Sequence, residues 1–221
     1  DVWIEDGIAY SSNWADGVVA VDIGAKKHKE SDRSKSQFNP LLAKAGKGSP
    51  SNPQTLAEMK DPTGRNHAAF PYLSESTGKF YIVGGDENFP WGVMATKDKP
   101  SNPRGAYHFL DFTDPDNPSE EAIYEVPEAG SHNLWIYGDM LLAGNYQGGL
   151  RVVDISGDLL GDIYKQGREI AHYLSYHEKG RIANAPMVWG AQPYKDYIFF
   201  SDMNSGLYCV QLEEESSSST D

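Results

Sequence analysis

The sequence has a single cysteine, Cys209, and no long hydrophobic run. One cysteine excludes an internal disulfide. Because a membrane-spanning helix needs about 20 mostly apolar residues, the sequence predicts no membrane span. Cys209 lies in an alternating segment, 207–210, which favours a small buried hydrophobic side chain over a reactive thiol.

Basic residues are also scarce, with 19 Lys and Arg against 32 Asp and Glu and a formal net charge of −13. Nucleic-acid binders need basic side chains to neutralise phosphates, so the charge excludes a nucleic-acid partner. The same charge disfavours anionic lipid surfaces. The sequence shows neither a phosphate-binding loop nor a Ser-His-Asp grouping, and these absences argue against the commonest enzyme classes. It also has no initiator Met and no signal peptide, so any targeting segment is expected upstream.

What the sequence does contain is a repeat. An aromatic-rich strand, a polar turn with glycine and an apolar strand recur in four units, and the apolar strand often ends in Asp. The units cover 2–24, 67–118, 132–156 and 185–212. A supersecondary unit that recurs every few dozen residues is typical of a propeller or another repeat array.

Each unit predicts several short strands. The first has Val2–Glu5, a hairpin turn at Asp6-Gly7, Ile8–Ser12 and Val18–Ile23. Outer strands are expected at Ala122–Val126 and Glu169–Leu174, whose composition is more polar. Four antiparallel strands per unit are a propeller blade. We therefore predict an all-β fold, a β-propeller with four visible blades that belongs to a larger ring.

The blades are expected to occupy residues 1–212. A charged insert at 25–64 breaks the repeat, and it contains one predicted helix that starts at Asn52-Pro53, with Asn as cap and Pro at the first position. Residues 213–221 form a Ser-rich acidic tail that we expect to be disordered. Asp22, Asp111 and Asp154 end the third strands, where Asp usually caps the following turn.

The segments 17–24, 109–118, 149–156 and 201–213 resemble the LVIVD-repeat family, predicted β-propellers found mostly on bacterial and archaeal cell-surface proteins. The resemblance covers about 140 residues in four units. It implies the propeller fold and an extracellular, cell-surface or periplasmic location, and it says little about activity.

Two histidines are candidate metal ligands. His67 and His132 open the innermost strands of the second and third units, so their side chains are expected to converge beside the central channel. Neutral imidazoles there can bind a transition metal, the only cofactor that the sequence suggests. The alternative is that each His is a structural latch, since the fourth unit has Ala185 where a third ligand should stand.

The turns between the second and third strands are expected on the same face. Aromatic side chains mixed with polar ones are typical of a recognition surface, although turns also need Asn and Asp for their backbone angles. The predicted ligand-binding face consists of Trp14, Asp16, Asp86, Glu87, Trp91, Asn145, Tyr146, Asp202 and Asn204.

Three functional hypotheses follow. The first is a non-catalytic binding or scaffolding propeller that recognises a protein or another ligand through the loop face. The second is a metal-dependent enzyme with the axial histidines as ligands. The third is a structural subunit whose further blades come from upstream sequence or from another chain.

Overall fold

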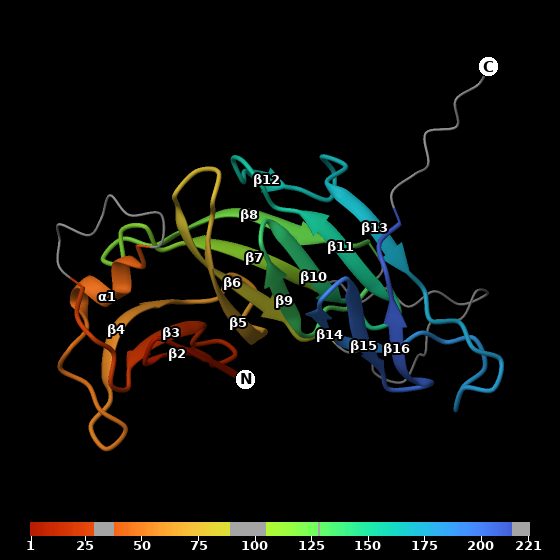
Figure 1. The fold of residues 1–221 in the computed structure, drawn as a ribbon, viewed down its shortest axis with the longest axis horizontal. Helices are drawn as coiled ribbons and strands as arrows, with labels where there is room; N and C mark the ends of the chain where they lie inside the picture. The colour runs from red at the N-terminus through yellow and green to blue at the C-terminus, as the bar shows by residue number, and fades with distance from the viewer. Residues whose placement is uncertain (29–37, 89–104, 128, 214–221) are drawn as a thin grey trace.

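The computed structural model describes residues 1–28, 38–88, 105–127 and 129–213. These residues form four antiparallel sheets arranged as a four-blade propeller, with one short helix (Figure 1). The all-β fold and the four blades are therefore confirmed. Within these ranges, no helix is long and apolar enough to cross a membrane.

The blades follow one another in chain order, from the red first blade to the blue fourth blade in Figure 1. The first contains β1 (Val2–Glu5), β2 (Ile8–Ser12), β3 (Val18–Asp22) and β4 (Gln54–Met59). The second contains β5 (Asn66–Leu73), β6 (Phe80–Asp86), β7 (Ala106–Asp111) and β8 (Ser119–Glu125), and β12 (Gly161–Asp162) pairs with β8 in parallel. The third contains β9 (Leu134–Tyr137), β10 (Met140–Gly144), β11 (Leu150–Asp154) and β13 (Glu169–Tyr173). The fourth contains β14 (Val188–Tyr194), β15 (Tyr197–Asp202) and β16 (Gly206–Val210).

Local sequence explains the hairpins. Asp6 and Gly7 both have positive φ, which matches the two-residue turn that suits twisted strands. At the corner between β2 and β3, Gly17 has φ +79°, and a Cβ there would lie 2.1 Å from the carbonyl oxygen of Met59. Gly149 occupies the same place in the third blade, with φ +79° and the carbonyl oxygen of Tyr173 at 2.3 Å. Each corner glycine thus allows the outer strand to approach closely.

The helix predicted at Asn52-Pro53 is wrong. Residues 54–59 form β4, which pairs with β3 and completes the first blade. The free edge of β3 offers a full set of backbone partners, and this tertiary pairing overrides the helical preference of the segment. The short helix α1 (Pro40–Lys44) begins instead at Asn39-Pro40, where the side chain of Asn39 accepts a hydrogen bond from the Leu41 N–H at 2.9 Å.

Three apolar clusters lie between consecutive blades. One joins the first blade to the second, one the second to the third, and one the third to the fourth. Successive side chains along a strand point to opposite faces of the blade, so both faces are apolar. In the third blade, Leu141 and Val153 face the second blade, whereas Leu142 and Val152 face the fourth. Among the described residues no corresponding cluster joins the fourth blade to the first.

The free face of the fourth blade is the exception to the burial pattern. Leu150 and Val152 of β11 are buried, but the residues at the same places in β16, Leu207 and Cys209, are exposed, Leu207 to 75%. The prediction that Cys209 is buried is therefore wrong. Its strand has the alternation of a face that a neighbouring blade would cover, and no blade within the described residues packs on it.

Candidate metal centre

Hydrogen bonds between neighbouring blades define which residues are equivalent. In the first three blades, the backbone N–H two residues after the second strand donates to a carbonyl oxygen in or just before the inner strand of the next blade. The three pairs are Trp14 to Asn66, Asn88 to Ser131, and Tyr146 to Val188. The residues directly after these carbonyls are therefore equivalent: His67, His132 and Trp189.

This register corrects the position expected for the fourth blade. Trp189, not Ala185, occupies the place of the two histidines. His67 and Trp189 each sit at a shift in the pairing of their strand, the first between Asn66 and Ala68 and the second between Val188 and Gly190. Bulges of this kind re-aim a side chain, and such a shift is not visible in a strand pattern.

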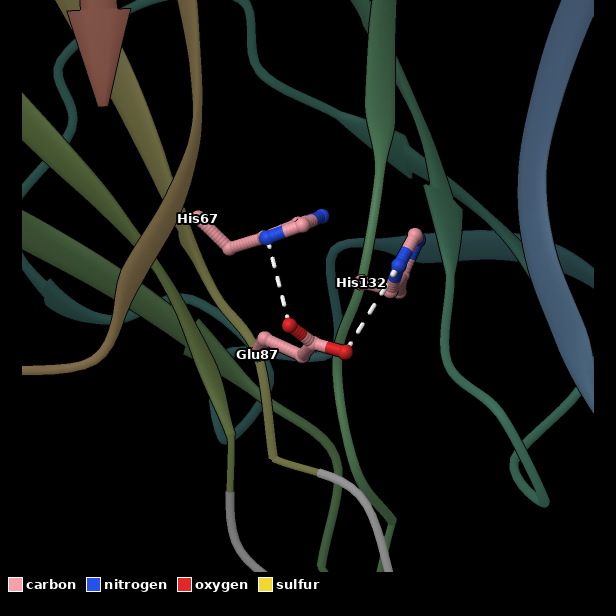
Figure 2. A group of neighbouring side chains, drawn as sticks. All are labelled: His67, Glu87 and His132. Atoms are coloured by element: carbon pink, nitrogen blue, oxygen red, sulfur yellow. Dashed lines mark ion pairs between the residues drawn. The ribbon is translucent and has the colours of Figure 1, made fainter. Parts of the chain in front are cut away.

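The two histidines converge as predicted. Their ring centroids are 4.4 Å apart. The carboxylate of Glu87, which follows β6, reaches toward both rings (Figure 2). Its Oε2 lies 3.2 Å from His67 Nδ1, and its Oε1 lies 3.9 Å from His132 Nε2. One ligand atom from each of the three residues lies within 4.8 Å of the others.

Glu87 was expected on the loop face rather than among the metal ligands. By the blade register it is equivalent to Asn13 and Asn145, which also precede the bridging residue. The fourth blade has Asp202 at this place. Glu87 has a longer side chain than the equivalent Asn and Asp residues of the other blades, and this length lets its carboxylate reach both histidines. A Glu at a position that is otherwise Asn or Asp is the sequence signal that could have identified it.

The surroundings of the two histidines favour the neutral imidazole form that binds a metal. The Nδ1 of His132 lies 2.9 Å from the carbonyl oxygen of Trp189, so Nδ1 carries the proton and Nε2 keeps its lone pair. Burial lowers the pKa of His67, and burial together with the nearby His67 lowers the pKa of His132. A lowered pKa favours the neutral imidazole, which is the form that binds metal.

Aromatic side chains surround the three residues. The Tyr146 hydroxyl donates to Glu87 Oε1 at 2.9 Å. Trp189 stacks on His132 with centroids 5.5 Å apart and an interplanar angle of 13°. Trp14 lies beside His67 at a centroid distance of 6.2 Å. These contacts restrict ring rotation and keep solvent from much of the site, since the side chains of His67 and His132 are 22% and 11% exposed.

The donor set fits a divalent transition metal. Two imidazoles and one carboxylate are the ligands of many zinc and non-haem iron sites, and three protein ligands leave coordination positions open to water or a small ligand. A metal held here would supply Lewis acidity. The chain's own residues would orient it: Glu87 through its bond from Tyr146, and His132 through its bond to Trp189.

Several residues of the predicted loop face are instead buried. Tyr146 is 1% exposed, so the expectation of an exposed aromatic is wrong at this position. Its backbone, at φ +42°, bridges to Val188 of the next blade, and its hydroxyl bonds to Glu87. Asn145 is also buried, and its amide donates to the carbonyl oxygen of Ala143 at 3.3 Å.

Asp86 and Asp202 are buried as well, and their carboxylates bind the protein itself. Asp86 accepts from Thr63 Oγ1 at 2.6 Å and from the Ala106 N–H at 3.1 Å. Asp202 accepts from the N–H groups of Met187, Asn204 and Ser205 and from the Ser175 hydroxyl. The amide of Asn204 donates to the carbonyl oxygens of Ile182 and Ala185. All three side chains therefore hold loops in place.

The remaining residues of that face are Trp14, Asp16 and Trp91. Trp14 and Asp16 are exposed, as expected. Trp91 lies outside the described residues. The predicted turn caps are confirmed: Asp22 accepts from the Gly24 N–H, Asp111 from the Thr113 N–H and Asp154 from the Ser156 N–H, all at 2.8–2.9 Å.

Comparison with known proteins adds support for the fold alone. No family model matches the sequence, and no curated protein matches it, so the resemblance to LVIVD-repeat proteins stays a prediction. Among solved structures, the chain is similar to the computationally designed Ika4 protein, with 9% identity and a TM-score of 0.50 over 96% of this chain and 89% of that one. The designed Ika8 protein aligns with 11% identity and a TM-score of 0.44 over 96% of this chain and 57% of that one.

Proposed function

We propose that this propeller binds a divalent transition metal ion through His67, His132 and Glu87. The observation that supports this function is the convergence, within 4.8 Å, of an imidazole and a carboxylate from the second blade and an imidazole from the third. Three protein ligands would leave coordination positions for a small metal-binding ligand or substrate. This favours the metal-dependent enzyme over recognition through the loop face.

The loop-face hypothesis has less support. Asn145, Tyr146, Asp86 and Asp202 are buried. Trp14 and Asp16 remain for a partner among the described members, with Glu87 and Asn204 partly exposed. A partner that stacks on Trp14 is compatible with a metal ion next to it, so binding of a second molecule stays part of the proposal.

Metal analysis tests the proposal. The protein is stripped with a chelator, titrated with Zn²⁺ and analysed for bound metal. We expect the double variant His67→Ala/His132→Ala to bind one ion fewer than the wild type. His172→Ala is the matched control, because His172 is an exposed histidine of β13 that also contacts a carboxylate, Glu169. Equal metal content in the double variant and the wild type would refute the site.

We also propose that further blades cover the free face of the fourth blade, and that they are supplied by upstream sequence or by another chain. Support comes from the repeated interface: the third blade buries Leu150 and Val152 against its neighbour, whereas Leu207 and Cys209 are exposed. On the first blade, Val2 and Ile4 are likewise more than half exposed. A cavity of about 460 Å³ is lined by residues of all four blades, and both Val2 and Leu207 are among them.

The free face has its own test. We expect the 221-residue chain to self-associate, because exposed apolar faces and strand edges promote association. Leu207→Asp should then shift the mass measured by light scattering toward 24.4 kDa. A wild-type chain that is monomeric at high concentration and unfolds in one cooperative step would contradict this proposal.

For location, we propose the periplasm or the cell surface, supported only by the resemblance to LVIVD-repeat proteins. Protease treatment of intact source cells tests it, because a surface protein is cleaved and a cytoplasmic one is protected.

A further inference from the structure

A second cluster of metal-ligating side chains lies where the connection from the first blade meets the second blade, outside the centre described above. It consists of Asp61, Asp86 and His108, and one ligand atom from each lies within 4.8 Å of the others. Asp61 follows β4, Asp86 ends β6 and His108 lies in the middle of β7. Three separate elements therefore bring these groups together.

Thr63 holds the two carboxylates. Its hydroxyl lies 3.0 Å from Asp61 Oδ1 and 2.6 Å from Asp86 Oδ1. The backbone N–H of Thr63 also donates to Asp61 Oδ1, at 2.7 Å. Thr63 thus engages both Oδ1 atoms, and the Oδ2 atoms remain for a ligand, although Asp86 Oδ2 also accepts a hydrogen bond from the Ala106 N–H at 3.1 Å.

Two atoms of the cluster lack hydrogen-bond partners. Asp61 Oδ2 and His108 Nε2 are buried and form no hydrogen bond with any described residue. His108 is 4% exposed, and its Nε2 faces Asp86 Oδ2 at 3.4 Å. Buried polar atoms are almost always hydrogen-bonded, so two orphans in one cluster call for an explanation.

The other nitrogen of His108 is oriented by a carboxylate. Its Nδ1 lies 2.5 Å from Glu120 Oε1 on β8. Metal-binding histidines usually donate their second N–H in this way, which fixes the ring and makes the free nitrogen more basic. The pair Glu120–His108 thus directs Nε2 at the two Asp carboxylates.

The charges favour a cation. Three carboxylates, from Asp61, Asp86 and Glu120, face one imidazole, so the group is negative even with a protonated ring. This excess of carboxylates around one imidazole attracts a cation.

We infer that Asp61, Asp86 and His108 form a second divalent cation site, distinct from the His67–Glu87–His132 centre. Two carboxylates and one imidazole are harder ligands than two imidazoles and one carboxylate, so Mn²⁺ is the ion that suits this site. The inference does not depend on the first centre, although Asp86 and Glu87 are neighbours in the chain.

The test removes the first centre and counts what remains. Chelator-treated Glu87→Gln/His132→Gln protein is titrated with Mn²⁺, and free Mn²⁺ is measured by electron paramagnetic resonance. We expect this protein to bind one Mn²⁺ ion. Adding Asp61→Asn should abolish binding, while Thr63 can still bond to the remaining oxygen. Adding Glu120→Gln should weaken binding about 10–100-fold.

Asp16→Asn in the same background is the control, because Asp16 is an exposed carboxylate on the first blade. Circular dichroism and thermal unfolding check that each variant is folded. Absence of Mn²⁺ binding in the Glu87→Gln/His132→Gln protein, or one bound ion in the folded Asp61→Asn variant, would overturn the site. Neither result would bear on the first centre, because that centre is tested separately with Zn²⁺ and the His67→Ala/His132→Ala variant.

Discussion

His132 and Trp189 contact each other twice, although 57 residues separate them in the chain. The imidazole bonds to the Trp189 carbonyl oxygen at 2.9 Å and stacks on the indole at 5.5 Å. The two residues occupy equivalent places on adjacent blades. One position of the repeat therefore supplies a ligand in the third blade and its orienting group in the fourth.

This contact predicts an effect of Trp189→Ala on metal affinity. The carbonyl remains in the variant, but the ring of His132 loses its stacking partner and gains freedom to rotate. We expect Zn²⁺ affinity to fall about 10-fold, at the lower end of the range for groups that orient ligands. Isothermal titration calorimetry measures the change. Trp189→Phe should restore most of the affinity, and a loss that Phe cannot restore would argue against the stacking role.

Two substitutions of Tyr146 distinguish its role in orienting Glu87 from its role in core packing. Tyr146→Phe removes only the hydroxyl that donates to Glu87, and we expect a 10–100-fold loss of Zn²⁺ affinity. Stability should fall by about 1 kcal/mol, the usual value of one hydrogen bond. Tyr146→Ala should cost about 3 kcal/mol or more, as for other buried aromatics. Urea unfolding measures both changes in stability.

Trp14→Ala should change the free energy of unfolding by less than about 0.5 kcal/mol, since Trp14 is exposed.

The hydrogen bonds of Asp22 join the first blade to the insert at 25–64, and we predict that their contribution to stability is lost in acid. Its carboxylate accepts five backbone N–H groups, from Gly24, Ala25, Gly46, Lys47 and Gly48. Burial alone would raise the pKa of Asp22, but these hydrogen bonds hold it well below its ordinary value. The stabilisation is therefore present above the unfolded-state pKa and is lost as the pH falls through the folded-state pKa.

We expect Asp22→Asn to lower the free energy of unfolding by about 2–3 kcal/mol at pH 7, because bonds to a charged acceptor are strong. The difference between wild type and variant should shrink as the pH falls below 4. Urea unfolding at several pH values measures it. A difference that is independent of pH would mean that the charge of Asp22 contributes nothing.

Cys209 reports on the free face of the fourth blade. The thiol is exposed in this chain and should react with a maleimide without denaturant. In an assembly where another blade packs on β16, labelling should be strongly slowed, because the partner covers the thiol. Labelling of the dilute and the concentrated protein, monitored by mass spectrometry, compares the two states. Equal rates in monomer and assembly would place the interface elsewhere.

Much of the fold could be read from local pattern. The bounds of β1 and β2 agree with the predicted strands, because the Asp6-Gly7 turn separates two short strand-forming runs. Local pattern failed at β4, where a segment with helical preference pairs with the edge of β3. It also failed at Cys209, whose alternation assumes a neighbouring blade.

The sequence by itself determined the repeat, the blades and the two histidines at the start of inner strands, since turns and alternation act between residues close in the chain. Only the tertiary structure decided that Glu87 joins them, that Tyr146 is buried, and that Trp189 takes the third position. These outcomes depend on bulges and on backbone hydrogen bonds between blades. Such contacts join residues tens of positions apart, and a local sequence pattern does not predict them.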